Sequence, residues 1–96
     1  MANTAMKFST NDGSYSGGYT SNVVRGNFNN NSNQTRGVIQ VDITTGTVDL
    51  QMRLTNDAPW FTVKTYSADT VEEVVLAPYM RVVATDTAEC WVAETL

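Results

Sequence analysis

The chain has 96 residues with 10 acidic and 6 basic side chains, a formal net charge of −4, no histidine and one cysteine. A fold of this length builds one small hydrophobic core, so we expect a single domain over residues 1–96 and not a multidomain enzyme. The acidic balance argues against nucleic acid and anionic membranes as partners. The lack of histidine excludes histidine-based triads and histidine-supported zinc sites, so we expect no enzyme activity and no cofactor.

The first third of the chain is rich in glycine, asparagine and other turn residues, which predicts loops. Within residues 1–20, the large apolar side chains Phe8, Tyr15 and Tyr19 are spaced too irregularly for an amphipathic helix or a regular strand. We expect residues 1–20 to form an N-terminal arm, which either frays or orders against a partner through these three rings. Within the first third of the chain, only residues 22–28 have the apolar content of a strand.

Residues 38–43 and 47–54 alternate between apolar and polar side chains, which is the pattern of half-buried strands. A four-residue loop over residues 44–47 would join them as a hairpin. Ile43 would then lie opposite Val48, and the remaining apolar residues of the two segments would also lie opposite each other. That register keeps every apolar pair on the core face. The expected core positions are Ile39, Val41, Ile43, Val48, Leu50, Met52 and Leu54.

The same register would place Asp42 directly opposite Asp49 on the outer face. Two carboxylates in this position repel each other by a few tenths to ~1 kcal/mol unless a cation lies between them. The alternatives are a solvated acidic patch relieved by Arg53 or by screening, a basic residue from a neighbouring subunit, or a hard metal ion, for which two carboxylates are too few. An acid/base pair would need a pocket that the sequence does not indicate. Asp42 and Asp49 are therefore candidate partner contacts.

Four further segments follow turn signals and have the composition of strands: residues 60–66, 71–77, 79–85 and 89–94. The last segment is expected to form a hairpin with residues 79–85. Six or seven strands at about ten-residue spacing, with no helix, predict an all-β fold. The expected architecture is an antiparallel β-sandwich or a small barrel with a loop-rich N-terminal arm.

Two side chains in this region carry both a structural and a functional interpretation. Trp60 is expected to anchor the start of a strand in the core, and the alternative is a ligand platform. We expect a carboxylate from Glu72, Glu73 or Glu89 to satisfy Arg81, and the alternative is a contact with a partner.

Cys90 is the one thiol, and no cation neighbours it in the sequence to lower its pKa. We expect an unreactive residue of the core. A lone thiol fits a reducing compartment, and residues 1–10 lack the apolar stretch of a signal peptide, so we expect synthesis in a cytoplasm. No apolar run approaches the ~20 residues needed to span a bilayer.

Three stretches of the second part of the chain point to a family: residues 47–53 (TVDLQMR), 57–64 (DAPWFTVK) and 77–82 (APYMRV). Together they resemble small virion proteins of tailed bacteriophages, and the likeness covers roughly residues 37–96. The resemblance implies an accessory structural protein that decorates or stabilises the capsid, with a tail or fibre position as the nearest alternative. It implies a major capsid protein and copies of the chain itself as partners, and a virion location after synthesis in the host. A homotrimer is favoured because capsid lattices have local threefold positions.

Three classes of function are therefore weighed: a virion structural protein, a small aromatic-lined module that binds carbohydrate or a host surface, and an enzyme, for which the sequence supplies no nucleophile and base. Residues 1–48 carry three basic and two acidic side chains, whereas residues 49–96 carry three basic and eight acidic ones. This asymmetry suggests that the arm lies across the acidic sandwich of a neighbouring subunit. Deleting residues 1–20 should then weaken assembly and leave the sandwich folded.

Overall fold

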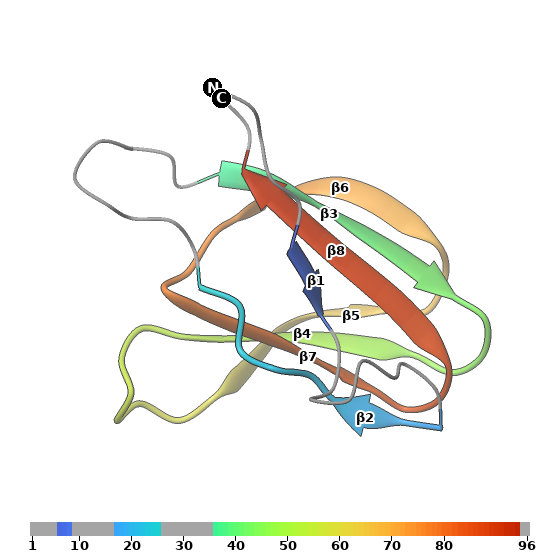
Figure 1. Ribbon diagram of the computed structural model, residues 1–96, viewed down its shortest axis with the longest axis horizontal. Helices are drawn as coiled ribbons and strands as arrows, with labels where there is room; N and C mark the ends of the chain where they lie inside the picture. The colour runs from blue at the N-terminus through green and yellow to red at the C-terminus, as the bar shows by residue number, and fades with distance from the viewer. Residues whose placement is uncertain (1–5, 9–16, 26–35, 95–96) are drawn as a thin grey trace.

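The computed structural model describes residues 6–8, 17–25 and 36–94 of the chain (Figure 1). In these residues every regular element is a β-strand, and the strands form two antiparallel sheets of four that pack against each other without closing into a barrel. The expected all-β sandwich is confirmed. The eight strands are β1 (Met6–Phe8), β2 (Tyr19–Thr20), β3 (Arg36–Ile43), β4 (Val48–Arg53), β5 (Phe61–Tyr66), β6 (Thr70–Val75), β7 (Tyr79–Ala84) and β8 (Ala88–Glu94).

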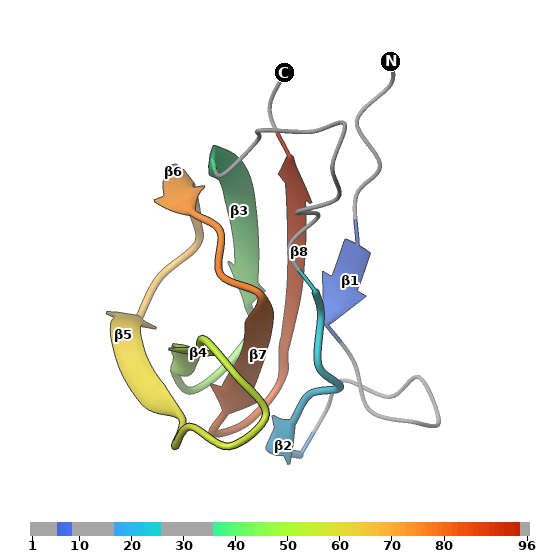
Figure 2. The ribbon, with the colours of Figure 1, turned by 90° about the vertical axis from the view of Figure 1, so that its left-hand side faces the viewer.

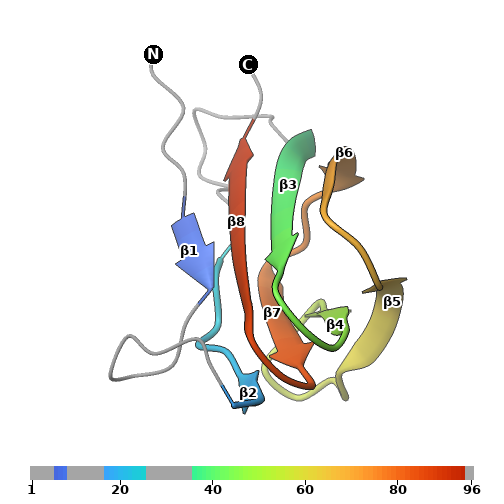
Figure 3. The same ribbon diagram turned by 90° about the vertical axis from the view of Figure 1, so that its right-hand side faces the viewer.

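The strand order of the two sheets defines the topology. Sheet A has the order β1-β8-β3-β6, and sheet B has the order β2-β7-β4-β5. Viewed from its two sides, the molecule shows the sheets as facing layers, with β6 and β5 along one open edge (Figures 2 and 3). Every connection crosses from one sheet to the other except the one between β4 and β5, which pair as neighbours. This arrangement is the double-sheet jelly roll.

The inward side chains of the alternating strands fill the space between the sheets. Ile39, Val41, Val48 and Leu50 are all buried, as the sequence predicts, because successive side chains of a strand point to opposite faces. Leu54 is the exception: it follows the end of β4 and is 71% exposed. The largest fully buried side chains are Phe8, Ile39, Leu50, Met80, Val41, Val48, Val82, Val92 and Cys90.

The expected hairpin between residues 38–43 and 47–54 is wrong. β3 lies in sheet A between β8 and β6, whereas β4 lies in sheet B between β7 and β5, so Ile43 and Val48 are not paired. The inward positions were assigned correctly because two strands joined by a hairpin and two strands on facing sheets obey the same alternation. The chain crosses between the sheets at Gly46, whose φ of +84° favours glycine.

The expected hairpin between residues 79–85 and 89–94 is wrong for the same reason, because β7 belongs to sheet B and β8 to sheet A. The two crossings lie side by side and are joined by backbone hydrogen bonds. The Thr85 amide donates to the Thr47 carbonyl at 2.9 Å, and the Thr44 amide donates to the Thr87 carbonyl at 3.0 Å. Each crossing therefore satisfies polar backbone groups of the other.

The described parts of the N-terminal segment belong to the sandwich, which corrects the expected arm. β1 is an edge strand of sheet A and pairs Phe8 with Cys90, and β2 is an edge strand of sheet B and pairs Tyr19 with Ala84. Apolar burial explains this placement, since the Phe8 ring is fully enclosed. Of the strand expected over residues 22–28, Val24 forms an isolated bridge to Met80, and the residues from 26 onward lie outside the described part.

Candidate functional site

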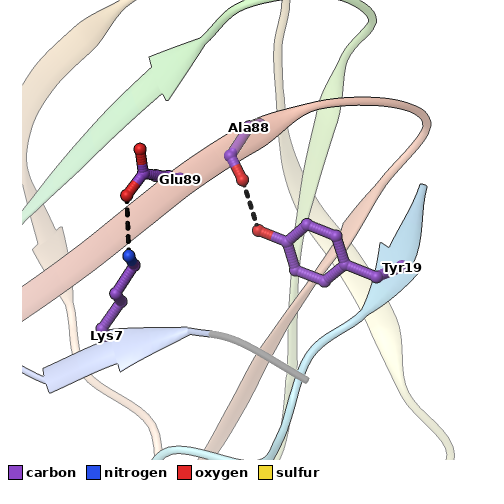
Figure 4. Close-up of polar contacts among 4 residues, drawn as sticks. All are labelled: Lys7, Tyr19, Ala88 and Glu89. Atoms are coloured by element: carbon purple, nitrogen blue, oxygen red, sulfur yellow. Dashed lines mark hydrogen bonds and ion pairs between the residues drawn. The ribbon is translucent and has the colours of Figure 1, made fainter. Parts of the chain in front are cut away.

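The structure separates the two aspartates that were expected to face each other. Asp42 projects from sheet A and lies opposite Glu89 of β8, whereas Asp49 lies in sheet B and accepts a hydrogen bond of 2.8 Å from the Thr65 hydroxyl. This correction follows from the crossing between β3 and β4, which moves the two residues to different sheets. A cross-strand acidic pair does exist, formed by Asp42 and Glu89. Its cation comes from the same chain, because Lys7 Nζ lies 2.7 Å from Glu89 Oε2 (Figure 4).

Two of the rings named as partner contacts are buried in their own chain. Phe8 is 0% exposed and Tyr19 is 9% exposed. The Tyr19 hydroxyl donates a hydrogen bond of 2.6 Å to the Ala88 carbonyl oxygen (Figure 4). Burial first, and then the charges of Cys90 and Glu89, raise the pKa of Tyr19 to about 12. Tyr15, the third ring, lies outside the described residues.

Arg81 does not meet a carboxylate, which corrects the sequence expectation. Its Nε donates a hydrogen bond of 2.8 Å to Gln51 Oε1, the residue opposite it on β4. The three glutamates considered for Arg81 are each engaged elsewhere: Glu89 with Lys7, Glu73 with Arg36, and Glu72 with Lys64 and the Tyr66 hydroxyl. Arg81 therefore stays on the outer face of sheet B without a charged partner among the described residues.

Trp60 is half-buried and contacts arginines, so it does not anchor the core as expected. Together with its neighbours it forms an alternating row of cations and rings that we call the arginine–aromatic stack, made of Arg25, Tyr79, Arg53, Trp60 and Arg81. Along the row, the distance from guanidinium carbon to ring centroid is 4.2 Å for Arg25 and Tyr79 and 5.3 Å for Arg53 and Tyr79. Arg53 and Arg81 both lie 4.4 Å from the centre of Trp60.

Strand register builds the stack. β4 and β7 pair Arg53 with Tyr79 and Gln51 with Arg81, and these residues alternate with inward side chains such as Met80. Their side chains are therefore neighbours on the outer face of sheet B. The turn after β4 then brings Trp60 back to the same place, just before β5 begins.

The stack concentrates positive charge. No carboxylate among the described residues lies within ion-pair distance of Arg25, Arg53 or Arg81. Partial burial and the nearby charge of Arg53 lower the pKa of Arg81. Arg53 Nε is buried and has no hydrogen-bond partner within the described ranges. The outer face of sheet B thus holds like charges next to each other, which is unfavourable unless an anion approaches.

A second surface lies between the edge strands β5 and β6, and we call it the β5–β6 groove. It has a volume of about 350 Å³ and is lined by Leu50, Met52, Val63, Lys64, Tyr66, Glu72, Val74 and Val75. Val63 interrupts the pairing of β5 with β4 as a bulge. The apolar rim is open to solvent, since Val63 is 53% and Val75 66% exposed, and Phe61, opposite Met52, is 67% exposed.

Metal-ligating and nucleophilic side chains are the next feature of the described residues. They contain no group of three or more histidine, cysteine or acidic side chains placed to hold a metal ion. Cys90 is fully buried, as expected, and burial together with the charges of Asp42 and Glu89 raises the pKa of its thiol to about 12. The part of the chain that the structure describes contains no helix able to cross a membrane.

No protein-family model, curated protein or solved structure matches the chain. The functional interpretation therefore depends on the jelly-roll topology and on the two surfaces. Sequence reasoning singled out Arg81 and Trp60 one at a time and missed Arg25, Tyr79 and the role of Arg53 in the stack. The sequence pattern that could have revealed the stack is the alternation that places Arg53, Tyr79 and Arg81 at outward positions of their strands.

Proposed function

We propose that the protein is a non-enzymatic structural protein of a tailed-phage virion that decorates or stabilises the capsid. The observation that carries the proposal is the strand order of the two sheets, β1-β8-β3-β6 and β2-β7-β4-β5. Jelly rolls of this kind are the building unit of many viral capsid proteins, although the fold alone does not fix a function. The resemblance of residues 37–96 to small virion proteins supports the same class.

The β5–β6 groove is the attachment surface in this proposal. A monomer of this size rarely leaves several large apolar side chains together in water, so Phe61, Val63 and Val75 are suited to contact another protein. The partners are a major capsid protein and further copies of this chain, with a trimer as the favoured assembly. The polar group formed by Lys64, Glu72 and the Tyr66 hydroxyl lies in the groove and would orient the partner.

A carbohydrate-binding or host-surface module, for example in a tail or fibre, is the second candidate, because jelly rolls also occur in lectins. Tyr79 and Trp60 lie on an outer face, as sugar-stacking rings do in such modules. However, Arg25, Arg53 and Arg81 already lie against these two rings, which leaves less ring surface for a sugar. This contact favours the virion proposal.

Val71 and Val75 provide a matched test, because both are 66% exposed on β6 and only Val75 is among the groove residues. Purified protein is incubated with particles of the phage whose genome carries the sequence, and the bound fraction is measured by co-sedimentation. We expect binding, and we expect Val75→Ser to weaken it by about tenfold, the effect of ~1.5 kcal/mol of lost apolar burial. Val71→Ser should bind as the wild type does.

Mass in solution and binding to a glycan array complete the test. A trimer without glycan binding is the expected result. A monomer that ignores the particles and binds a glycan would overturn the proposal in favour of the carbohydrate-binding module. Equal losses for the two valine variants would show that the groove is not the attachment surface.

A further inference from the structure

We infer that the arginine–aromatic stack on sheet B is a second docking surface, whose occupant is a protein surface carrying paired Asp or Glu carboxylates. The inference depends on the contacts of Arg25, Arg53, Arg81, Trp60 and Tyr79 and not on the virion assignment. It also concerns a different face of the molecule from the β5–β6 groove, since none of these five residues lines that groove.

The distribution of charge is the first step. The chain has six basic residues, and the described structure places a carboxylate beside Lys7, Lys64 and Arg36, all outside the stack. The other three basic residues form the stack, and no carboxylate of the described residues lies beside them. In a chain with a net charge of −4, this selective lack of partners leaves one positive face on an acidic protein.

The geometry of the guanidinium groups is the second step. The rings of Tyr79 and Trp60 hold the guanidinium groups by contact, and one hydrogen bond fixes each arginine: Arg25 Nε to the Pro78 carbonyl, Arg81 Nε to Gln51 Oε1, and Arg53 Nη1 to the Asn56 carbonyl. Terminal N–H groups of all three arginines remain without an acceptor among the described residues. A fixed guanidinium with free N–H groups is suited to bind a carboxylate through two parallel hydrogen bonds.

The class of occupant follows from the shape and composition of the face. Small ligands bind in concave sites, whereas the stack is built on Arg53, Tyr79 and Arg81 at outward positions of paired strands. A long polyanion such as a nucleic acid would be repelled by the rest of an acidic chain. Arginine, tryptophan and tyrosine are the residues that most often dominate protein–protein binding energy. An acidic protein surface fits a face that is not concave, is not a long polyanion, and is the kind of partner that arginine, tryptophan and tyrosine bind.

The test uses hexaglutamate as the probe and the full chain carrying Trp91→Phe, which leaves Trp60 as the only tryptophan. Titration at low ionic strength is followed by Trp60 fluorescence. We expect saturable binding that weakens as salt is added. Arg53→Gln and Arg81→Gln should each weaken binding by about tenfold, the effect of losing one charge-assisted hydrogen bond. Arg36→Gln, the same change on sheet A, should leave it unchanged.

Circular dichroism and thermal unfolding verify that the variants fold. Arg81→Lys is a second variant, since it keeps the charge and loses the planar donor pair, and we expect binding between that of the wild type and Arg81→Gln. No hexaglutamate binding, or an equal loss in Arg36→Gln, would overturn the inference. So would tighter binding of a polyuronate or of oligo-dT than of hexaglutamate.

Self-association is examined separately by sedimentation of the chain without a probe. If Arg53→Gln abolished an assembly that the wild type forms, the occupant would be a second copy of this chain, which would overturn the inference of a separate partner. Unchanged sedimentation is the expected result. Val75→Ser should bind hexaglutamate as the wild type does, so that failure at the stack and failure at the groove are distinguishable.

Discussion

A methyl group added at Gly37 would overlap the carbonyl oxygen of Ala93, on the neighbouring strand β8. The same methyl group would lie 3.0 Å from the Leu76 side chain. Because the closest atom belongs to backbone in the middle of sheet A, the strands must shift to make room. We expect Gly37→Ala to lower the free energy of unfolding by ~1–3 kcal/mol, measured by urea denaturation. Gln40→Ala, an exposed position on the same strand, should change it little, and equal effects would contradict the close approach.

Leu50 and Gln51 are consecutive residues of β4 that point to opposite faces. Leu50 is 1% exposed, so Leu50→Ala should cost ~2–5 kcal/mol through lost burial and an unfilled cavity. The Gln51 side chain forms hydrogen bonds with Thr62 and Arg81 on the outer face, and Gln51→Ala should cost less than ~1 kcal/mol because the strand pairing is unchanged. Thermal unfolding of both variants checks the prediction, which fails if the two changes cost the same.

Phe8 tests whether the N-terminal strand folds onto its own chain. Phe8 belongs to β1 of sheet A and its ring is fully buried in the hydrophobic core, so Phe8→Ala should cost ~3–5 kcal/mol. A contact within one chain is lost equally at any protein concentration, whereas a strand exchanged between copies would make stability depend on concentration. We therefore expect the same loss at low and at high micromolar protein. A loss of stability that changes with protein concentration would instead support the exchange of the arm between subunits that the sequence suggested. Lys7→Ala is the control, because Lys7 is the adjacent residue and is partly exposed.

Tyr19 should make stability fall at alkaline pH. Its pKa is raised from the ordinary value of 10.0 to about 12, so the neutral phenol is the form that the fold favours. The corresponding stability is complete below pH 10 and is lost as the pH rises through 12, by on the order of 2 kcal/mol. Unfolding free energies between pH 8 and 12 should show this fall, and Tyr19→Phe should show a shallower one. The slope remaining in that variant includes the contributions of Cys90 and Tyr66, because burial also raises the pKa of these two groups.

Alternation was enough to predict the inward side of each strand but not its partner. Ile39, Val41, Val48 and Leu50 face the interior whether β3 and β4 form a hairpin or lie in opposite sheets, so their pattern leaves both possibilities open. Only contacts distant in sequence, such as the pairing of β3 with β8, decide between the two. The predicted pairing of the two aspartates was wrong because it depended on the predicted hairpin. The acidic residue that lies opposite Asp42 is Glu89 of β8.

The stack was harder to predict than the core because it depends on three separate segments. Arg25 precedes β3, Arg53 ends β4 and Tyr79 begins β7, and only the folded sheet brings them together. Alternation along the strands places Arg53 and Arg81 at outward positions, but the sequence gives no reason to place Trp60 against these two arginines rather than in the core. Pairing of Arg81 with a glutamate was expected from charge alone, whereas in the structure its guanidinium lies against the Trp60 ring.

The position of β8 has a consequence for the order in which the protein acquires its structure. Among the described strands, β4 and β5 are the one pair that is adjacent both in the sequence and in a sheet, so their hairpin is the local contact from which ordering can begin. β8 lies between β1 and β3, so most of sheet A cannot assemble until the last strand has been synthesised. On the ribosome, the apolar side of β1 stays without its partner strand until β8 has been synthesised. A chain whose pairings are so distant folds on the slow side, in milliseconds to seconds, and its first strand is exposed to wrong partners until then.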